Sequence, residues 1–174
     1  PTVNRQSGLL KPELNNSNIL GSSISIPYYK VISDNKDFTF KPTIFDENIF
    51  MFQSEYRQKN KNSYLITDFN IVDNYKSKKS NKENTLTHLF SKYELDLDFK
   101  DYVESSVNIS FQKVNNDTYL KVFDANIVNT DLKPDNFDTL TSEIDFNLEN
   151  EKFALNAGFT SYENLSELNS DRYQ

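Results

Sequence analysis

Apolar and polar residues alternate one by one along several segments of the chain. From Asp37 to Ile44 every even position is apolar and every odd position is polar. In Tyr93–Phe99 three acidic residues occupy every second position, and a strand gathers them on one side whereas a helix distributes them around its circumference. The same period of two continues in Val103–Gln112, Leu140–Glu149 and Phe153–Phe159. These segments are predicted to be β-strands with one apolar face.

Weaker alternation predicts further strand segments. They are Ser22–Ile32, Ile49–Arg57, Tyr64–Val72 and Leu86–Lys92, the last of which runs into the strand that begins at Tyr93. Short polar breaks rich in Asn and Asp separate most of these segments, and breaks of that length join antiparallel neighbours. The prediction is therefore an all-β fold, an antiparallel meander of about eight amphipathic strands.

Three stretches do not fit this rhythm. Two longer connections are expected at Asp73–Asn84 and Asn115–Asp138, and Ser161–Asn169 has apolar residues at helical spacing, so its structure is left open between helix and strand. The alternation also assigns residues to faces. The residues expected on the apolar side are Phe38, Phe40, Leu95, Leu97, Val107, Ile109, Phe146 and Leu155. The residues expected on the polar side are Glu94, Asp96, Asp98, Glu104, Asn108, Glu143 and Asp145.

The alternation has two physical interpretations. In a soluble sandwich or a lipocalin-like barrel the apolar face turns inward, whereas in an outer-membrane barrel it faces lipid and the polar face lines a wet lumen. Many of the predicted strands approach the ~9–11 residues that a tilted membrane strand requires. Periodicity alone does not choose between the two interpretations.

Composition removes several classes of function. The chain has 174 residues, which suits one domain, and a net charge of −7 with no basic stripe that could neutralise a run of phosphates, which argues against nucleic-acid binding. It has no cysteine and one histidine, so a transition-metal site is not expected. No apolar run reaches the ~20 residues of a spanning helix. No cofactor is expected.

The remaining candidate chemistry is weak. His88 has no Cys, second His or Ser-Asp pair at a useful spacing, so no role is assigned to it. The acidic residues of Tyr93–Phe99 lie ~6.6 Å apart along one strand face, which favours a hydrated surface over a calcium site. The lysines at positions 76, 78, 79 and 82 are interpreted as a solvated loop, with contact to phosphates as the alternative. The protein is not expected to be an enzyme.

Several short motifs resemble a known family. Arg5-Gln6-Ser7-Gly8-Leu9-Leu10-Lys11-Pro12, Ile26-Pro27-Tyr28-Tyr29 and Asp37-Phe38-Thr39-Phe40-Lys41-Pro42 stand in the order and spacing found where the LPS-assembly outer-membrane protein family (LptD, organic solvent tolerance protein) enters its barrel. Weaker matches are Ser54-Glu55-Tyr56-Arg57, Asp117-Thr118-Tyr119-Leu120 and Asp171-Arg172-Tyr173-Gln174, the last of which resembles the start of a later strand of that barrel. Lys30 stands where the family usually has an aromatic residue, and Ser54 where it has Gly. The chain resembles the N-terminal part of that barrel.

The resemblance implies a transport function without covalent chemistry. Residues 1–21 would lead in from a preceding periplasmic domain, and residues 22–174 would form the first strands of the transmembrane barrel. Members of the family receive lipopolysaccharide from a periplasmic bridge protein, pass its sugars through the polar lumen and release its lipid sideways between the first and last strands. A lipoprotein plugs the barrel. The implied location is the outer membrane of a Gram-negative bacterium; the side on which the long connections lie is left open.

Two prolines are candidate gate residues. Pro27 lies in the first predicted strand and Pro42 in the second, and neither can donate to a β-ladder. On residues alone, protection of an edge strand is the more ordinary explanation. The resemblance favours a lateral gate that opens beside them.

Two other classes of function remain as alternatives. A self-contained eight-stranded barrel that binds a small lipophile would pair its last strand with its first, whereas a fragment would leave Ser22–Ile32 and Phe153–Ser161 as open edges. A hydrolase on a β scaffold would need an exposed nucleophile within hydrogen-bond reach of His88.

Overall fold

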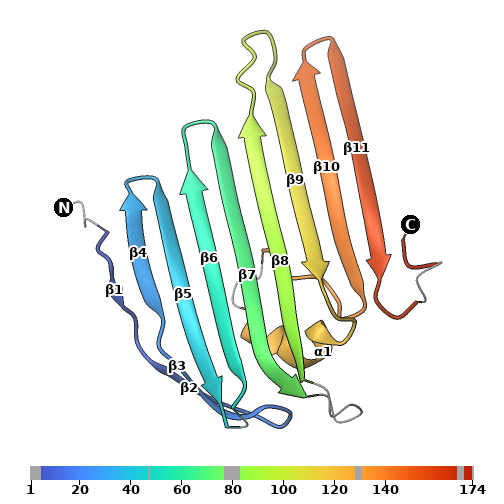
Figure 1. Cartoon of the computed structure of the whole chain (residues 1–174). Helices are drawn as coiled ribbons and strands as arrows, with labels where there is room; N and C mark the ends of the chain where they lie inside the picture. The colour runs from blue at the N-terminus through green and yellow to red at the C-terminus, as the bar shows by residue number, and fades with distance from the viewer. Residues whose placement is uncertain (1–4, 47, 77–82, 128–130, 168–170, 174) are drawn as a thin grey trace.

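The chain forms one open antiparallel sheet. The computed structural model describes residues 5–46, 48–76, 83–127, 131–167 and 171–173. In these residues eleven strands belong to a single sheet, and a short helix lies across it (Figure 1). The last strand of the sheet order does not pair with the first, so the sheet is not a closed barrel. The predicted all-β meander and partial barrel are confirmed.

The elements follow one another along the chain with short turns between most of them. In order they are β1 (Gly8–Leu9), β2 (Glu13–Ser17), β3 (Gly21–Ser25), β4 (Tyr28–Ser33), β5 (Lys36–Phe45), β6 (Phe50–Lys59), β7 (Ser63–Lys76), β8 (Glu83–Asp96), β9 (Glu104–Val114), α1 (Tyr119–Phe123), a 3-10 turn η1 (Asp124–Asn126), β10 (Thr139–Asn150) and β11 (Phe153–Asn164).

The first predicted strand is broken and is not an edge. The segment Ser22–Ile32 divides into β3 and β4 at Ile26 and Pro27, and both pieces pair with β5. On their other side β2 pairs with β3 and β1 pairs with β4. The prediction that Ser22–Ile32 forms an open edge was wrong, because residues 8–17, which sequence alternation did not identify as strand, cover it. We call residues 8–17 the leading segment.

Three boundaries differ from the predictions. The strand predicted to reach Phe99 ends at Asp96, because Asp98 has a φ of 52° and its N–H donates to the Asp96 carboxylate at 2.8 Å. Half of the expected long connection Asp73–Asn84 is strand, since β7 continues to Lys76 and β8 begins at Glu83. The rest of that connection, with lysines 78, 79 and 82, lies outside the described residues.

The stretch Ser161–Asn169 begins as strand, not helix. β11 continues to Asn164 and pairs with β10 along its whole length. Tyr173 then forms an isolated antiparallel bridge with Glu163, so the last described residues start a further pairing on the outer side of β11. This agrees with the resemblance of residues 171–174 to the start of a later strand.

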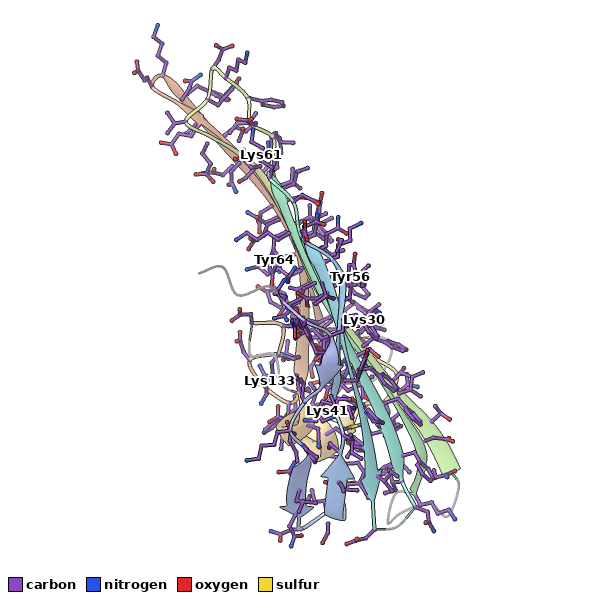
Figure 2. The ribbon with its side chains drawn as sticks, turned by 90° about the vertical axis from the view of Figure 1, so that its left-hand side faces the viewer. Lys30, Lys41, Tyr56, Lys61, Tyr64 and Lys133 are labelled. Carbon is purple, nitrogen blue, oxygen red and sulfur yellow. The ribbon has the colours of Figure 1, made fainter. Side chains whose placement is uncertain are left out.

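The strand register separates an apolar face from a polar face. Phe38 pairs with Tyr56, Leu95 with Val107, and Phe146 with Ala157, so side chains of the predicted apolar set share one side of the sheet. Leu97 lies just beyond β8, where its N–H donates to the Ser105 carbonyl. Figure 2 shows Lys30 and Tyr56 on one side of the ribbon and Tyr64, Lys41 and Lys133 on the other.

The hydrophobic core lies on the polar face. The connection after β9 carries α1 and η1 across this face near the ends of β7 and β8 (Figure 1). We call its described part, residues 115–127 and 131–138, the covering segment. The buried apolar residues of the core include Phe45, Met51, Ile66, Val72, Leu86, Phe90, Val114, Leu120, Phe123, Ile127 and Leu132. Because β7 and β8 are apolar on both faces here, their alternation in the sequence is weak.

Candidate functional site

Each candidate gate proline removes one bond from the β-ladder. The Ile26 N–H donates to the Pro42 carbonyl at 3.2 Å, and the Leu10 N–H donates to the Pro27 carbonyl at 2.8 Å. Hydrogen-bonded antiparallel pairs normally exchange two such bonds. A proline has no N–H with which to return the second bond. The pairing is therefore weakened twice, once between the leading segment and β4 and once between β5 and the β3–β4 junction.

A buried carboxylate next to these strands joins three parts of the chain. Asp37 on β5 is 4% exposed. Arg5 Nη1 lies 2.5 Å from its Oδ2, and Arg57 Nε from β6 lies 2.8 Å from its Oδ1. Arg5 also donates to the carbonyls of Ser33 and Asp34, at 3.3 and 2.6 Å. We call Arg5, Asp37 and Arg57 the Asp37 cluster; its members come from three of the motifs that resemble the LptD family.

Other polar contacts also hold the leading segment and the residues before it. Lys41 Nζ on β5 lies 2.6 Å from Glu13 Oε2 on β2, and the Val31 N–H donates to the Ser7 hydroxyl at 2.9 Å. A cavity of about 200 Å³ lies between this segment and the sheet, with Leu10 and Pro27 among its lining residues. Side-chain contacts thus attach these N-terminal residues to the sheet, and their backbone pairs with it over only a short length.

A second polar cluster is buried beneath the covering segment. The Tyr119 hydroxyl on α1 lies 2.6 Å from both Asn70 Nδ2 and His88 Nδ1. His88 Nε2 lies 3.2 Å from Asp68 Oδ1, and Gln53 Nε2 donates to the same carboxylate. All five side chains are nearly fully buried. Burial raises the pKa of Tyr119 well above its ordinary value, so the phenol stays protonated.

These contacts give His88 a structural role, whereas the sequence alone assigned it none. The hydroxyl within its reach belongs to a tyrosine that is 0% exposed, not to the exposed nucleophile that the hydrolase alternative requires. Its ring also stacks on Phe90, with centroids 4.3 Å apart. His88 therefore joins the covering segment to the sheet.

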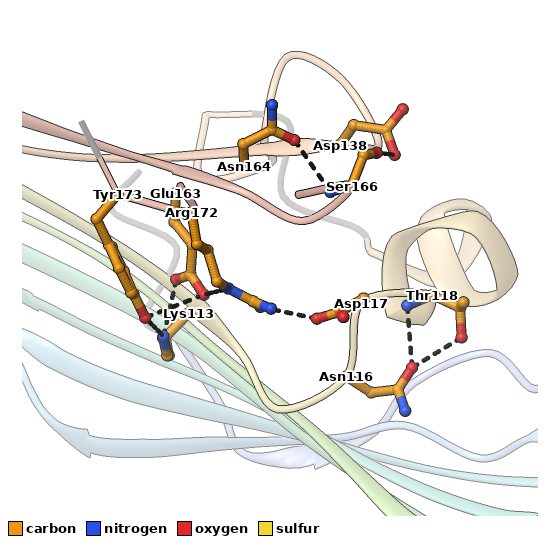
Figure 3. A network of polar contacts seen from close by, with 10 residues as sticks. All are labelled: Lys113, Asn116, Asp117, Thr118, Asp138, Glu163, Asn164, Ser166, Arg172 and Tyr173. Carbon is orange, nitrogen blue, oxygen red and sulfur yellow. Dashed lines mark hydrogen bonds and ion pairs between the residues drawn. The ribbon is translucent and has the colours of Figure 1, made fainter. Parts of the chain in front are cut away.

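A third cluster lies at the opposite edge of the sheet (Figure 3). The Glu163 carboxylate on β11 accepts hydrogen bonds from Lys113 Nζ at 2.8 Å and from Arg172 Nε at 2.7 Å. Arg172 Nη2 donates a further bond of 2.7 Å to Asp117. The hydrogen bonds that Arg172 donates to Asp117 and Glu163 raise the pKa of Arg172 above its ordinary value. Tyr173 donates to Glu163 at 3.3 Å. We call these residues the Glu163 cluster; it ties the covering segment to the residues that follow β11.

A neighbouring contact fixes the end of the covering segment. Asp138 accepts bonds from Lys121 at 2.5 Å and from the Ser166 hydroxyl at 2.8 Å, and these bonds hold its pKa below the ordinary value. The Ser166 N–H in turn donates to the Asn164 side chain (Figure 3). The covering segment is therefore anchored to β11 as well as to β7 and β8.

The predicted polar residues share a face but form no compact site. Glu94 pairs with Asn108, Asn108 with Asp145, and Asp96 with Ser106, so they lie on the side of the sheet that carries the covering segment. Glu104 and Glu143 have the same parity on their strands. Asp98 lies beyond the end of β8. Glu94, Asp96 and Asn108 line one pocket, but the set as a whole is spread over β8, β9 and β10.

The described residues offer no metal centre. Among them no group of three or more His, Cys, Asp or Glu side chains is arranged to hold a metal ion. Nor do these residues include a helix both long and apolar enough to cross a membrane.

The apolar face is open to the surroundings along the whole sheet. Its large exposed side chains are between 38% and 68% accessible and include Ile24, Ile26, Ile44, Phe52, Phe69, Leu89, Phe111, Ile144, Phe153, Leu155 and Phe159. The covering segment lies on the other face. A continuous apolar surface of this extent is unusual for a monomeric soluble protein and is typical of a surface that contacts lipid or another protein.

Comparison with known proteins gives the sequence relationship. No protein-family model matches the chain. The LPS-assembly protein LptD of Albidiferax ferrireducens is 42% identical over 65 residues, which are 37% of this chain and 7% of that protein. The LPS-assembly protein LptD of Idiomarina loihiensis is 26% identical over 102 residues, 59% of this chain and 14% of that protein.

The chain thus spans a small fraction of the length of these curated relatives. The sequence motifs resemble the same family to which both matched proteins belong, and the open antiparallel sheet is consistent with part of a barrel. The resemblance of this chain to the LptD family of LPS-assembly proteins is confirmed.

Proposed function

We propose that this chain forms the first strands of an outer-membrane barrel that inserts lipopolysaccharide into the outer leaflet. The observation that carries the proposal is the exposed apolar face, which extends from β3 to β11 on an open sheet. Both matched relatives are named LPS-assembly protein LptD, which supports the choice of lipopolysaccharide. The location that follows is the outer membrane of a Gram-negative bacterium.

The two faces of the sheet suit the two halves of the transported molecule. The apolar face would contact the acyl chains of the membrane, because charged groups there would cost free energy. The polar face, with Glu94, Asn108 and Asp145, would line a wet lumen along which sugars pass. The chemistry is binding and passage, with no covalent step. The partners of the whole protein would be a plug lipoprotein and a periplasmic bridge protein.

The lateral gate belongs to the same proposal. Pro27 and Pro42 each leave one carbonyl of a hydrogen-bonded pair without its return bond, so the first strands separate at a lower cost than a complete ladder. A lipid that leaves sideways requires such a weakened seam.

The lipocalin-like alternative is not favoured. A small lipophile-binding barrel buries its apolar face and closes its first strand on its last. Here the apolar face is exposed, and β11 does not pair with the first strands.

Paired lysine substitutions on β9 test the orientation of the two faces. Ile109 lies on the apolar face between Tyr93 and Ile144, whereas Ser110 lies on the polar face between Lys92 and Glu143. In the full-length protein, Ile109→Lys should reduce barrel assembly, because lysine facing lipid costs up to ~2–4 kcal/mol near the bilayer centre. Ser110→Lys should assemble normally. Equal assembly of both variants would contradict the membrane proposal.

The transport step is tested separately. Depletion of the full-length protein in its host should lower the amount of lipopolysaccharide in the outer leaflet, and the unmodified protein should restore it. An unchanged outer leaflet after depletion would contradict the proposed function even if the barrel assembles.

A further inference from the structure

The leading segment is the least firmly paired part of the sheet. β1 contributes only the pairs Gly8–Tyr29 and Leu9–Tyr28, and the pair that follows lacks its return bond because Pro27 cannot donate. β2 pairs over five residues, but only with β3. Between β1 and β2 lies Pro12. Backbone pairing alone therefore gives this segment little protection from exchange with water.

The Asp37 cluster supplies the attachment that the backbone lacks. Asp37 is buried, and its two carboxylate oxygens are each bonded to a different arginine. Arg57 is fixed on β6, while Arg5 stands three residues before β1. The further bonds of Arg5 to the carbonyls of Ser33 and Asp34 bring it against the turn between β4 and β5. The contact therefore links the residues just before the leading segment to β4 and β5.

The carboxylate charge is essential to this arrangement. Without it, the half-exposed Arg5 and Arg57 guanidinium groups would lose the anion that they share, and Arg57 would keep only Glu55, whose Oε1 lies 3.4 Å from Arg57 Nε. Arg5 would then keep only its bonds to the carbonyls of Ser33 and Asp34, which carry no full charge to hold the guanidinium in place. Arg57 is held by its strand, so Arg5 is the partner that moves away.

We propose that Asp37 is a positioning residue that holds the leading segment over β3 and β4, and that release of Arg5 uncovers the backbone edge of these strands. With the leading segment in place, its strands β1 and β2 form the outer edge of the sheet. With Arg5 released, β4 becomes the outermost strand at the position where Pro27 and Pro42 already weaken the ladder. An effect of Arg5 release on lipid export rests on the proposed function, whereas the contact between Arg5 and Asp37 does not.

Hydrogen–deuterium exchange of the full-length protein in detergent tests the positioning role. In Asp37→Asn, amides of residues 8–17, including the Leu10 N–H bonded to Pro27, should exchange at least about tenfold faster than in the unmodified protein. Arg5→Gln should have the same effect. Amides of β7 to β10 should exchange at the unmodified rate, which separates loss of this contact from general loss of stability.

Glu163→Gln is the matched control. Glu163 is another buried carboxylate bonded to two cations, but it lies at the opposite edge of the sheet. This variant should leave exchange in residues 8–17 unchanged and should accelerate exchange around Arg172. Asp37→Glu keeps the charge and should restore much of the protection that Asp37→Asn removes.

Two results would overturn the positioning role. One is equal exchange of residues 8–17 in Asp37→Asn and in the unmodified protein. The other is equal acceleration throughout the sheet in Asp37→Asn, which indicates a general structural defect. The outer-leaflet lipopolysaccharide of the same variants reports on the proposed function independently. Faster exchange with unchanged lipopolysaccharide would support the positioning role and contradict the gate.

Discussion

Asn70 on β7 donates a hydrogen bond of 2.6 Å to the hydroxyl of Tyr119 on α1, although 49 residues separate them in the chain. This bond joins the covering segment to the polar face of the sheet. His88 reaches the same hydroxyl from β8. One buried phenol therefore links two strands and a helix.

Tyr119→Phe is expected to lower the free energy of unfolding by ~1–3 kcal/mol, because Asn70 and His88 lose their shared partner while remaining buried. Denaturant unfolding of the full-length protein in detergent measures the change. Tyr162→Phe is the control, since Tyr162 is 47% exposed on β11 and should tolerate loss of its hydroxyl. Equal stability of Tyr119→Phe and the unmodified protein would show that the bond contributes nothing.

Replacing both Pro27 and Pro42 with Thr should strengthen the first strands by up to two ladder bonds of ~0.5–1.5 kcal/mol each. The full-length double variant should assemble normally, place less lipopolysaccharide on the surface and make cells more sensitive to large hydrophobic antibiotics. Each single replacement should act more weakly. Pro134→Thr, in the covering segment, is the control. Export at the unmodified rate by the double variant would show that the two prolines have no part in a gate.

The isolated chain is expected to need detergent in order to remain dispersed. Its sheet exposes Phe52, Phe69 and Phe159 among many apolar residues, and β11 offers free backbone groups along most of its outer side. Size-exclusion chromatography with and without detergent measures this. A monodisperse monomer that melts cooperatively in plain buffer would favour the lipophile-binding alternative.

Gly21→Ala should destabilise the turn between β2 and β3 by about 1 kcal/mol. Gly21 has a φ of 73°, and an added Cβ would lie 2.9 Å from the Asp46 carboxylate, which accepts the Ser22 N–H. Gly8→Ala should have little effect, because an added Cβ there meets nothing within 4 Å. Thermal unfolding of the two full-length variants in detergent compares them, and equal melting temperatures would be inconsistent with this turn geometry.

Acid should loosen the end of the covering segment. The bonds from Lys121 and Ser166 lower the pKa of Asp138 in the folded protein, so their contribution is present above the ordinary value of 3.8 and is lost as the pH falls through the lower folded value. Limited proteolysis of residues 131–138 should show this loss as the pH is lowered from about 6 to about 2, well below the ordinary carboxylate value. Asp138→Asn should be cleaved faster at pH 6 and respond less to acid.

The alternation of apolar and polar residues predicted a strand well where only one of its two faces is apolar. It located β5, β9, β10 and β11 because each of these strands keeps a period of two over most of its length. It gave a weaker signal for β7 and β8, where Ile66 and Phe90 are buried beneath the covering segment while the next positions remain on the apolar face. A tertiary contact on the polar face cannot be read from a strand's own pattern.

The polar clusters were less predictable than the strands. Arg5, Asp37 and Arg57 were visible as motif residues, but their meeting depends on the register of β5 with β6 and on the path of the residues before β1. Lys113 and Glu163 meet across β10, which no local spacing encodes. His88 received no role because its partners come from β7 and from α1.

The position of the core has a consequence for the order in which the protein folds. The covering segment buries Phe90, Met51 and Leu120 on the face turned away from the apolar surface, so this end of the sheet excludes water by itself. These contacts do not require lipid to form. We therefore expect β6 to β9 and α1 to become ordered while the chain is still in the aqueous phase. The side chains of the apolar face would contact lipid only when the strands insert into the membrane.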